Sequence, residues 1–285
     1  MKRLTIRHIQ KMKDDAQPIT MLTAYDVTSA RIAEAADVPM LLVGDTLGMV
    51  VQGHHSTIPV KLEHMIYHAE IVTRVTERPF VVGDLPFMTY SISPEQALEN
   101  SAKLMQESGV SAVKLEGGEN LAPTIKRITD AGIPVMAHIG LTPQSVNQFG
   151  GFRVQGKQLD SARQLIRDAE AVQAAGAFAV VLELVPTKLS ALITGELDIP
   201  TIGIGAGADC DGQVQVFHDI LALFDDFVPK HTRRYSNIKE MMQSAIQQYR
   251  VEVEQGAFPT ADNSFAMGDE VIAALLDEVA RVHHR

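Results

Sequence analysis

Two aspartates in this chain close the same short motif, and each stands where a buried strand is predicted to end. Leu41 to Asp45 and Phe80 to Asp84 are apolar runs that lead through a glycine to the acid. Such unbroken apolar runs are typical of parallel strands buried on both faces. If adjacent strands deliver the two carboxylates at the same height, the charges repel each other, so the pair is expected to bind a cation or to hold a proton.

A third acid, Glu116, ends the similar run Ala112 to Glu116. Asp45, Asp84 and Glu116 would together form an all-oxygen ligand set without a nearby cysteine, which suits Mg²⁺ or Mn²⁺ better than Zn²⁺. The sequence therefore predicts a divalent-cation site. The structural alternative is that each acid caps a helix or turn after its strand.

Lys114 precedes Glu116 by two residues, so the two side chains share one face of the predicted strand. Burying an unpaired ammonium group is costly, so Lys114 needs a negative partner. Two partners remain open at this point: Glu116 itself, in a structural pair, or an anionic substrate.

Two further ionisable residues end later apolar runs. Glu183 lies between Leu182 and Leu184, and apolar surroundings favour the neutral form of a carboxyl group, which suits a general base. A Glu that pairs with a neighbouring basic residue is the alternative. His138 follows Ala137, and we count it among the candidate substrate-binding residues, with a hydrogen-bonded core histidine as its alternative.

The elements that would position these residues alternate along the chain. Helical spacing of apolar residues, clearest from Leu62 to Thr76, separates the strand-like runs and gives eight β/α units, which predicts an α/β fold, a (β/α)8 TIM barrel. Residues 1–285 are expected to form a single barrel domain. Its N-terminal helix, Thr5 to Asp14, would plug the bottom of the barrel. The extra C-terminal helices, Ile238 to Val253 and Met267 to Val282, include a last one that would pack outside the barrel or on a partner subunit.

Composition narrows the class of protein. The 35 acidic residues against 25 basic ones give a net charge of −10, which argues against a nucleic-acid partner because Lys and Arg contacts to phosphate dominate such binding. The single cysteine, Cys210, is compatible with a reducing compartment. The N-terminus lacks an apolar signal segment, and no run approaches the roughly 18 apolar residues of a membrane helix. We expect a cytoplasmic protein without a membrane partner.

Taken together, these motifs resemble the ketopantoate hydroxymethyltransferases of pantothenate biosynthesis. The resemblance runs from about Thr20 to Asp219, with the motifs in the order that the family has. They are Leu22 to Asp26, Val43 to Met49, Val82 to Phe87, Val113 to Gly118, Ala137 to Gln144 and Gly203 to Gly207.

The resemblance implies a barrel of the phosphoenolpyruvate mutase/isocitrate lyase type, a Mg²⁺ site and a large homo-oligomer, typically a decamer. The implied reaction transfers a hydroxymethyl group from 5,10-methylenetetrahydrofolate to 3-methyl-2-oxobutanoate. The implied roles are metal binding for Asp45, Asp84 and Glu116, substrate contact for Asp45, Thr46, Asp84 and Lys114, and proton acceptance for Glu183.

The chain departs from the family pattern in two places. Thr46 stands where members usually have Ser, and the segment Phe258 to Phe265 differs from the usual Glu- and His-containing version. Two other functions stay open. Another member of the superfamily could act on a different 2-oxo acid, although isocitrate lyases carry a catalytic cysteine motif and the one cysteine here, Cys210, lies elsewhere. The chain could also be an inactive barrel retained for binding or assembly.

Overall fold

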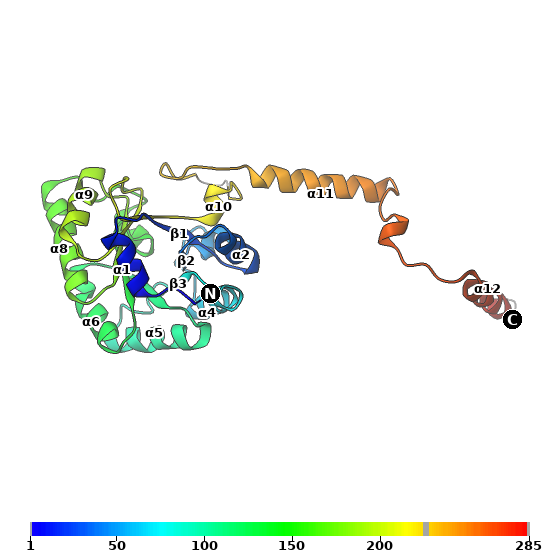
Figure 1. The fold of residues 1–285 in the computed structure, drawn as a ribbon, viewed down its shortest axis with the longest axis horizontal. Coiled ribbons are helices and arrows are strands. Elements are labelled where there is room, and N and C mark those ends of the chain that lie inside the picture. Colours follow the sequence, from blue (N-terminus) through cyan, green and yellow to red (C-terminus); the bar gives the residue numbers. More distant parts are fainter. Residues whose placement is uncertain (1, 225–227, 284–285) are drawn as a thin grey trace. The chain divides into compact units, whose positions relative to one another are not determined.

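The computed structural model describes residues 2–224 and 228–283, and the chain divides into two compact units. The first extends to Ser236 and contains a closed barrel of parallel strands in sequence order, β1 to β8 (Figure 1). The predicted fold class is thereby confirmed. The strands are β1 Ile19–Thr23, β2 Met40–Val43, β3 Phe80–Asp84, β4 Ala112–Glu116, β5 Val135–Gly140, β6 Ala179–Glu183, β7 Thr201–Ile204 and β8 Gly212–Gln215.

Helices connect and surround the strands within this unit (Figure 1). None of the helices in the described residues is long and apolar enough to span a bilayer. The α-helices of this unit are α1 Ile6–Asp14, α2 Val27–Ala35, α3 Leu47–Val50, α4 Leu62–Val75, α5 Pro94–Ser108, α6 Ala122–Asp130, α7 Val146–Phe149, α8 Leu159–Ala174, α9 Thr187–Glu196 and α10 Phe217–Ile220, and the short 3-10 turns are η1 Glu119–Leu121 and η2 Pro143–Ser145.

Local sequence explains where several of these helices begin and end. The Ser93 side chain accepts a hydrogen bond from the Gln96 backbone N–H and so caps α5, with Pro94 in the first turn. Gly109 ends the same helix in the left-handed conformation, at φ 73°. In the same way Asp26 caps α2 by accepting from Ser29 N–H, so this acid belongs to a helix rather than to the end of β1.

Two apolar layers hold the barrel together. One lies between strands and helices and includes Val113 and Leu115 of β4. The other lies inside the barrel and includes Ala112 of the same strand together with Ile9 of α1. Because successive strand residues point to opposite faces, Lys114 and Glu116 continue the inward row that Ala112 begins. Ile9 is fully buried in the inner layer, which confirms that α1 plugs the barrel.

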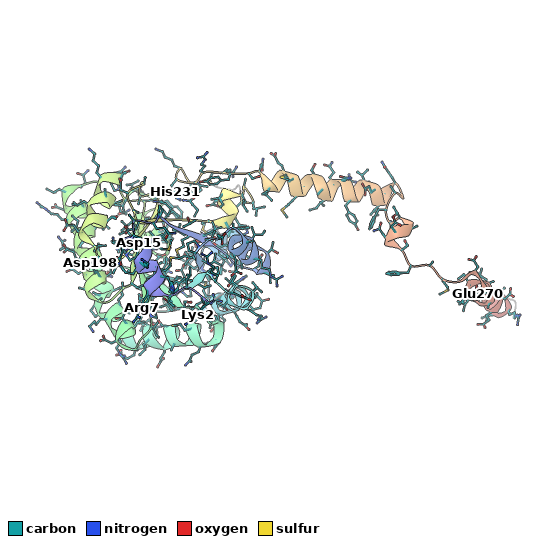
Figure 2. The ribbon with its side chains drawn as sticks, viewed as in Figure 1. Lys2, Arg7, Asp15, Asp198, His231 and Glu270 are labelled. Atoms are coloured by element: carbon teal, nitrogen blue, oxygen red, sulfur yellow. The ribbon has the colours of Figure 1, made fainter. Side chains whose placement is uncertain are left out.

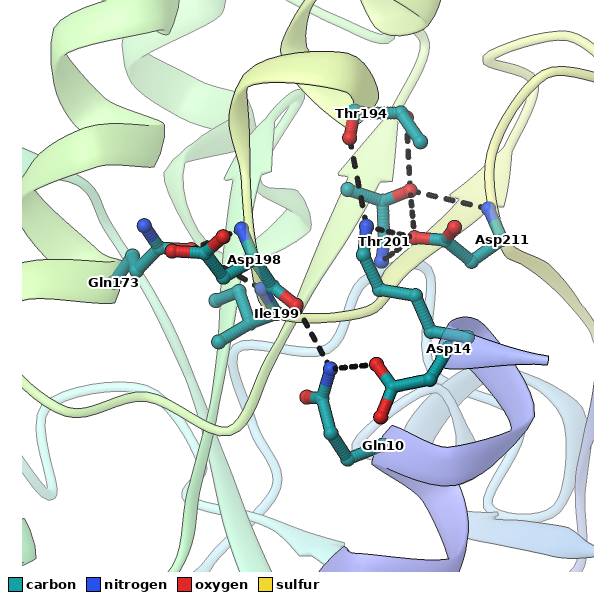
Figure 3. A network of polar contacts seen from close by, with 9 residues as sticks. Gln10, Asp14, Gln173, Thr194, Asp198, Ile199, Thr201 and Asp211 are labelled. Atoms are coloured by element: carbon teal, nitrogen blue, oxygen red, sulfur yellow. Dashed lines mark hydrogen bonds and ion pairs between the residues drawn. The ribbon is translucent and has the colours of Figure 1, made fainter. Parts of the chain in front are cut away.

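Polar contacts fix α1 at the amino-terminal end of the strands (Figure 3). Lys13 Nζ lies 2.9 Å from Asp211 Oδ2, and the same oxygen accepts hydrogen bonds from Thr201 N and Thr201 Oγ1 at 2.8 and 3.1 Å. Gln10 Nε2 donates to the Asp198 backbone carbonyl at 2.9 Å. Asp198, Arg7 of α1 and Asp15 just after α1 are labelled in Figure 2.

Two strand ends bear on the site. The apolar spacing from Val214 to Phe217 predicts an eighth strand there, but β8 is Gly212–Gln215, because Phe217 starts α10. β5 continues past Ala137 to Gly140, which places His138 within the strand instead of at its exit. The loop Thr46 to Pro59 contains α3, and the loop Leu141 to Gly156 contains η2 and α7.

The second unit begins at Asn237. It consists of α11 Ile238–Glu254, the 3-10 turn η3 Ala261–Asn263 and α12 Asp269–His283. The two predicted C-terminal helices are therefore present. That they belong to one domain with the barrel stays a prediction.

Candidate active site

One cavity of about 50 Å³ at the carboxyl ends of the strands brings all the predicted site residues together. It lies at the end of the barrel opposite α1, where catalytic side chains gather in this fold. The predicted residues that line it are Asp45, Thr46, Asp84, Lys114, Glu116, His138 and Glu183.

Lys114 forms a buried ion pair with Asp84. Lys114 Nζ lies 2.6 Å from Asp84 Oδ1, and the two side chains are 5% and 3% exposed. The pair follows from the strand register, since Asp84 of β3 is directly aligned with Lys114 of β4. The structural partner of Lys114 is therefore Asp84 and not Glu116. Burial by itself would lower the pKa of Lys114, but the carboxylates of Asp84, Glu116 and Asp45 outweigh it and raise the pKa, so the ammonium stays charged.

Asp45 and Asp84 lack sufficient positive charge around them. Burial raises the pKa of Asp45 well above its usual value, and the negative charges of Asp84 and Glu116 raise it further. The pKa of Asp84 is also raised by burial, although Lys114 offsets part of the effect. The Asp45 backbone N–H donates to Asp84 Oδ2 at 3.1 Å, which holds the two residues together. An additional cation would relieve this excess of negative charge.

Gln144, which our sequence analysis assigned no role, links two of the three acids. Its backbone N–H donates to Glu116 Oε2 at 2.9 Å and its side-chain Nε2 donates to Asp45 Oδ2 at 2.9 Å. Its Oε1 accepts from the Tyr90 hydroxyl at 2.6 Å. The residue is 4% exposed. The only signal in the sequence was its place in the motif Ala137 to Gln144, because nothing in its spacing relates it to Asp45 or Glu116.

His138 lies between two carboxylates. Its Nδ1 is 3.6 Å from Glu116 Oε1 and its Nε2 is 3.3 Å from Glu183 Oε2. Neither ring nitrogen has a partner with hydrogen-bond geometry in the described residues, so both contacts are ion pairs without aligned hydrogen bonds. Burial would lower the pKa of His138, but Glu116 and Glu183 raise it to about 9. Burial would raise the pKa of Glu116, but the His138 imidazolium, together with Lys114 and the Gln144 backbone N–H, lowers it.

The donor set fits a hard divalent cation. In residues 2–224 and 228–283 no three Asp, Glu, His or Cys side chains are placed so that together they could hold a metal ion. Mg²⁺ does not require three such ligands, because proteins usually bind it through one or two carboxylates and leave the other positions to water and substrate oxygens. Asp45 is held by Gln144 and Asp84 by Lys114, and such supporting contacts orient metal ligands.

Comparisons with known sequences agree with this geometry. A family model described as ketopantoate hydroxymethyltransferase matches residues 3–261. A 3-methyl-2-oxobutanoate hydroxymethyltransferase from Dehalococcoides mccartyi is 53% identical over 273 residues, which cover 96% of this chain and 98% of the relative. An enzyme of the same name from Chloroflexus aggregans is 56% identical over 274 residues, with 96% and 98% covered.

Solved structures extend the likeness of the fold. A phosphonopyruvate hydrolase in complex with oxalate and Mg²⁺ superposes with a TM-score of 0.58 at 12% identity, covering 98% of both chains. A 2,3-dimethylmalate lyase, described as a phosphoenolpyruvate mutase/isocitrate lyase superfamily member, has a TM-score of 0.58 at 16% identity and covers 99% of this chain and 98% of its own. At these identities the likeness concerns the fold alone, and it confirms the predicted type of barrel.

Proposed function

The chain belongs to the ketopantoate hydroxymethyltransferase family, and we propose that it transfers a hydroxymethyl group to 3-methyl-2-oxobutanoate, giving ketopantoate (2-dehydropantoate) in pantothenate biosynthesis. The observation that carries the proposal is the single cavity in which a charged Lys114, a carboxylate excess and Glu183 meet. The donor in this proposal is 5,10-methylenetetrahydrofolate.

The proposed metal site consists of Asp45, Asp84 and Glu116, with Mg²⁺ as the ion and Mn²⁺ as the alternative. When bound, the ion would supply Lewis-acid stabilisation of the negative charge that develops on the 2-oxo oxygen. The raised pKa values of Asp45 and Asp84, caused first by burial, support a cation requirement. The phosphonopyruvate hydrolase neighbour was solved with Mg²⁺ and oxalate, which like a 2-oxo acid offers adjacent oxygen ligands.

Lys114 and Thr46 are the proposed contacts to the substrate carboxylate and oxo group, with Asp45 and Asp84 on the same wall. Lys114 stays protonated because three carboxylates surround it, so it can balance an anionic substrate without a change of its own charge. The overall charge of −10 makes such a local cation necessary for binding an acid.

Glu183 is the proposed base that removes the C3 proton of the oxo acid. Its side chain is 13% exposed, at the end of β6, and the contact with His138 Nε2 orients one of its oxygens. His138 in this arrangement positions both Glu116 and Glu183, and its contact with substrate stays a prediction. The resulting C3 nucleophile forms a bond to the methylene carbon of the donor. Both nitrogen–methylene bonds of the donor break, one water supplies the hydroxyl group, and the two donor nitrogens take up the proton from C3 and the remaining proton of the water, so ketopantoate and tetrahydrofolate leave.

A homo-oligomer, with the decamer of the family as the expected size, is part of the proposal. Apolar side chains of α12 recur at helical spacing and are 44 to 73% exposed, which supports contact with another copy of the chain. The residues are Val271, Ile272, Leu275, Leu276, Val279 and Val282. The cytoplasm remains the proposed compartment, on the basis of the single cysteine.

The test is direct detection of the product. The full chain is incubated with 3-methyl-2-oxobutanoate, 5,10-methylenetetrahydrofolate and Mg²⁺, and ketopantoate is measured by mass spectrometry. We expect stoichiometric ketopantoate and tetrahydrofolate. An inactive barrel would give no product under any condition, and an enzyme for another 2-oxo acid would turn over that acid instead.

A further inference from the structure

A second and larger cavity opens beside the reaction cavity. It measures about 330 Å³, against about 50 Å³ for the first, so only the second has room for a bicyclic ring. The two cavities share part of their wall. The shared residues are Thr46, Pro143, Glu183, Ile204 and Val216. A molecule in the second cavity would therefore lie against the place where Glu183 meets the oxo acid.

Most of the wall that belongs to this cavity alone is apolar. Met49 and Val50 come from α3, Val154 from the segment before α8, and Leu184 from the turn after β6. Small-molecule sites typically combine such an apolar lining with a few polar groups that fix orientation. The cavity therefore suits a flat, largely apolar ring.

Two polar side chains in this wall have no hydrogen-bond partner in the described residues. Asp219 of α10 is 9% exposed, and no residue in 2–224 or 228–283 gives its carboxylate a hydrogen bond. Thr57 is 3% exposed, and its hydroxyl oxygen is likewise without a partner in the described residues. Burying a polar atom without a hydrogen bond is unfavourable, so the fully buried Thr57 hydroxyl points to a ligand that supplies the missing bond. The Asp219 carboxylate lines the same cavity and can accept hydrogen bonds from that ligand.

The charge of Asp219 restricts what the ligand can present. Burial raises the pKa of Asp219 to about 6, and Arg234 offsets only part of the effect, so the group is a carboxylate at neutral pH. An ionised carboxylate only accepts hydrogen bonds, and it pairs well with two adjacent N–H donors on a planar group. Lys230, exposed at the same cavity, offers a cation for acidic parts of the ligand that extend into solvent.

We propose that this cavity binds the pterin ring of the folate co-substrate, with Asp219 accepting hydrogen bonds from the ring N3–H and the 2-amino group, and with Thr57 bonding to a second polar atom of the ring. The inference rests on the proposed function, because that function supplies a folate as the second substrate. The inference goes beyond the proposed function by assigning the folate to particular residues. The shared wall at Glu183 then places the donor next to the deprotonated carbon.

The test uses two isosteric variants of the full chain and one matched control. Asp219→Asn replaces an acceptor oxygen by a donor amide, Thr57→Val removes only the hydroxyl, and Asp209→Asn makes the same chemical change as the first variant at an exposed position. Tetrahydrofolate binding is measured by titration calorimetry, and the KM values for both substrates are measured in the product assay. Circular dichroism melts verify that each variant is folded.

We expect Asp219→Asn to weaken tetrahydrofolate binding and to raise the KM for methylenetetrahydrofolate by about 10- to 100-fold, since a hydrogen bond to a charged group contributes on that scale. Thr57→Val should weaken both by about 3- to 10-fold. The control should match the wild type. In all three variants, exchange of the C3 proton of the oxo acid with deuterated water should be unchanged, because that step needs no folate.

The outcomes separate this inference from the proposed function. If the wild type makes ketopantoate but the folded Asp219→Asn variant keeps the wild-type folate KM, the cavity assignment is overturned and the function stands. If the wild type binds tetrahydrofolate, loses affinity on Asp219→Asn and yet makes no product, the proposed function fails and the assignment holds. Absence of tetrahydrofolate binding by the wild type would overturn the assignment directly.

Discussion

The two ends of the barrel both contain partly or fully buried carboxylates, but only one end balances them. At the amino-terminal end, a single oxygen of Asp211 receives Lys13 and two donors of Thr201, so charge and hydrogen bonds are satisfied (Figure 3). At the carboxyl-terminal end, Lys114 faces three buried acids. The contrast teaches that a satisfied network fixes the fold, whereas an unbalanced one leaves a place for a cation and an anionic substrate.

The imbalance has a definite scale. Two carboxylates about 4 Å apart repel by about 4 kcal/mol at an effective dielectric constant of 20, which is a large part of the stability of a typical domain. The carboxyl-terminal end therefore costs folding free energy until a cation binds. The predictions below test the contrast between the ends, in decreasing order of the expected effect.

Removal of divalent ions should have the largest effect. Treatment with excess chelator should reduce product formation to background, and added Mg²⁺ or Mn²⁺ should restore it. Because the ion binds the folded state only, saturation at about 100 times its dissociation constant should also stabilise the protein by about 2.7 kcal/mol, seen as a rise in Tm. Full turnover in the chelator, with an unchanged Tm, would contradict a cation site at this end.

Replacement of the base should come next. Glu183→Gln keeps the shape of the side chain and should lower kcat by about 10²- to 10⁴-fold, the usual contribution of a general base. Mg²⁺ and oxo-acid binding should stay near wild type, and exchange of the C3 proton with deuterium should be lost. The exposed Glu196→Gln is the matched control. Wild-type exchange in Glu183→Gln would transfer the role to another group on this wall, with His138 as the first candidate.

Lys114→Met should weaken oxo-acid binding by about 10- to 100-fold and tetrahydrofolate binding much less, because only the oxo acid would meet the ammonium group. The variant should also be less stable by about 3–5 kcal/mol, since Asp84 loses its buried partner. The measurements are two binding titrations and a denaturant melt. Equal losses for both ligands would show that Lys114 has a structural role only.

Asp211→Asn makes the corresponding change at the satisfied end. It removes the ion pair with Lys13 and disturbs the bonds from Thr201, so we expect a loss of about 1–3 kcal/mol in unfolding free energy. The kcat and both KM values should not change. A tenfold fall in kcat with wild-type stability would contradict the conclusion that the amino-terminal end serves the fold and not the reaction.

The effect of Asp219 on stability, as distinct from its effect on folate binding, comes last, and it should depend on pH. Its pKa is raised by burial to about 6 from an ordinary value near 3.8, so the folded state binds the proton more tightly. The Asp219 contribution to stability therefore falls as the pH rises from about 4 to 6 and stays lost above 6. Asp219→Asn should accordingly raise the Tm over wild type at pH 8 but not at pH 4. A gain of equal size at both values would assign the effect to something other than this charge.

Local sequence determined the elements of this protein and the kind of chemistry that they carry. Strand and helix periodicity are set by backbone geometry. Spacing alone was therefore enough to assign Lys114 and Glu116 to one face of a strand and to predict which face of α4 is buried. The order of the motifs along the chain identified the family. Asp45, Asp84 and Glu183 could be predicted as site residues because parallel strands place their last residues at one end of a barrel.

Tertiary structure alone decided which of these groups touch. The register of β3 against β4 pairs Lys114 with Asp84 rather than with Glu116. Register depends on packing between strands, and the spacing of residues within one strand carries no information about that packing. Gln144 reaches Asp45 from 99 residues away in the sequence. Thr57 comes to this cavity from a loop and Asp219 from α10, and their positions follow from the closed barrel, so no local pattern could have paired them.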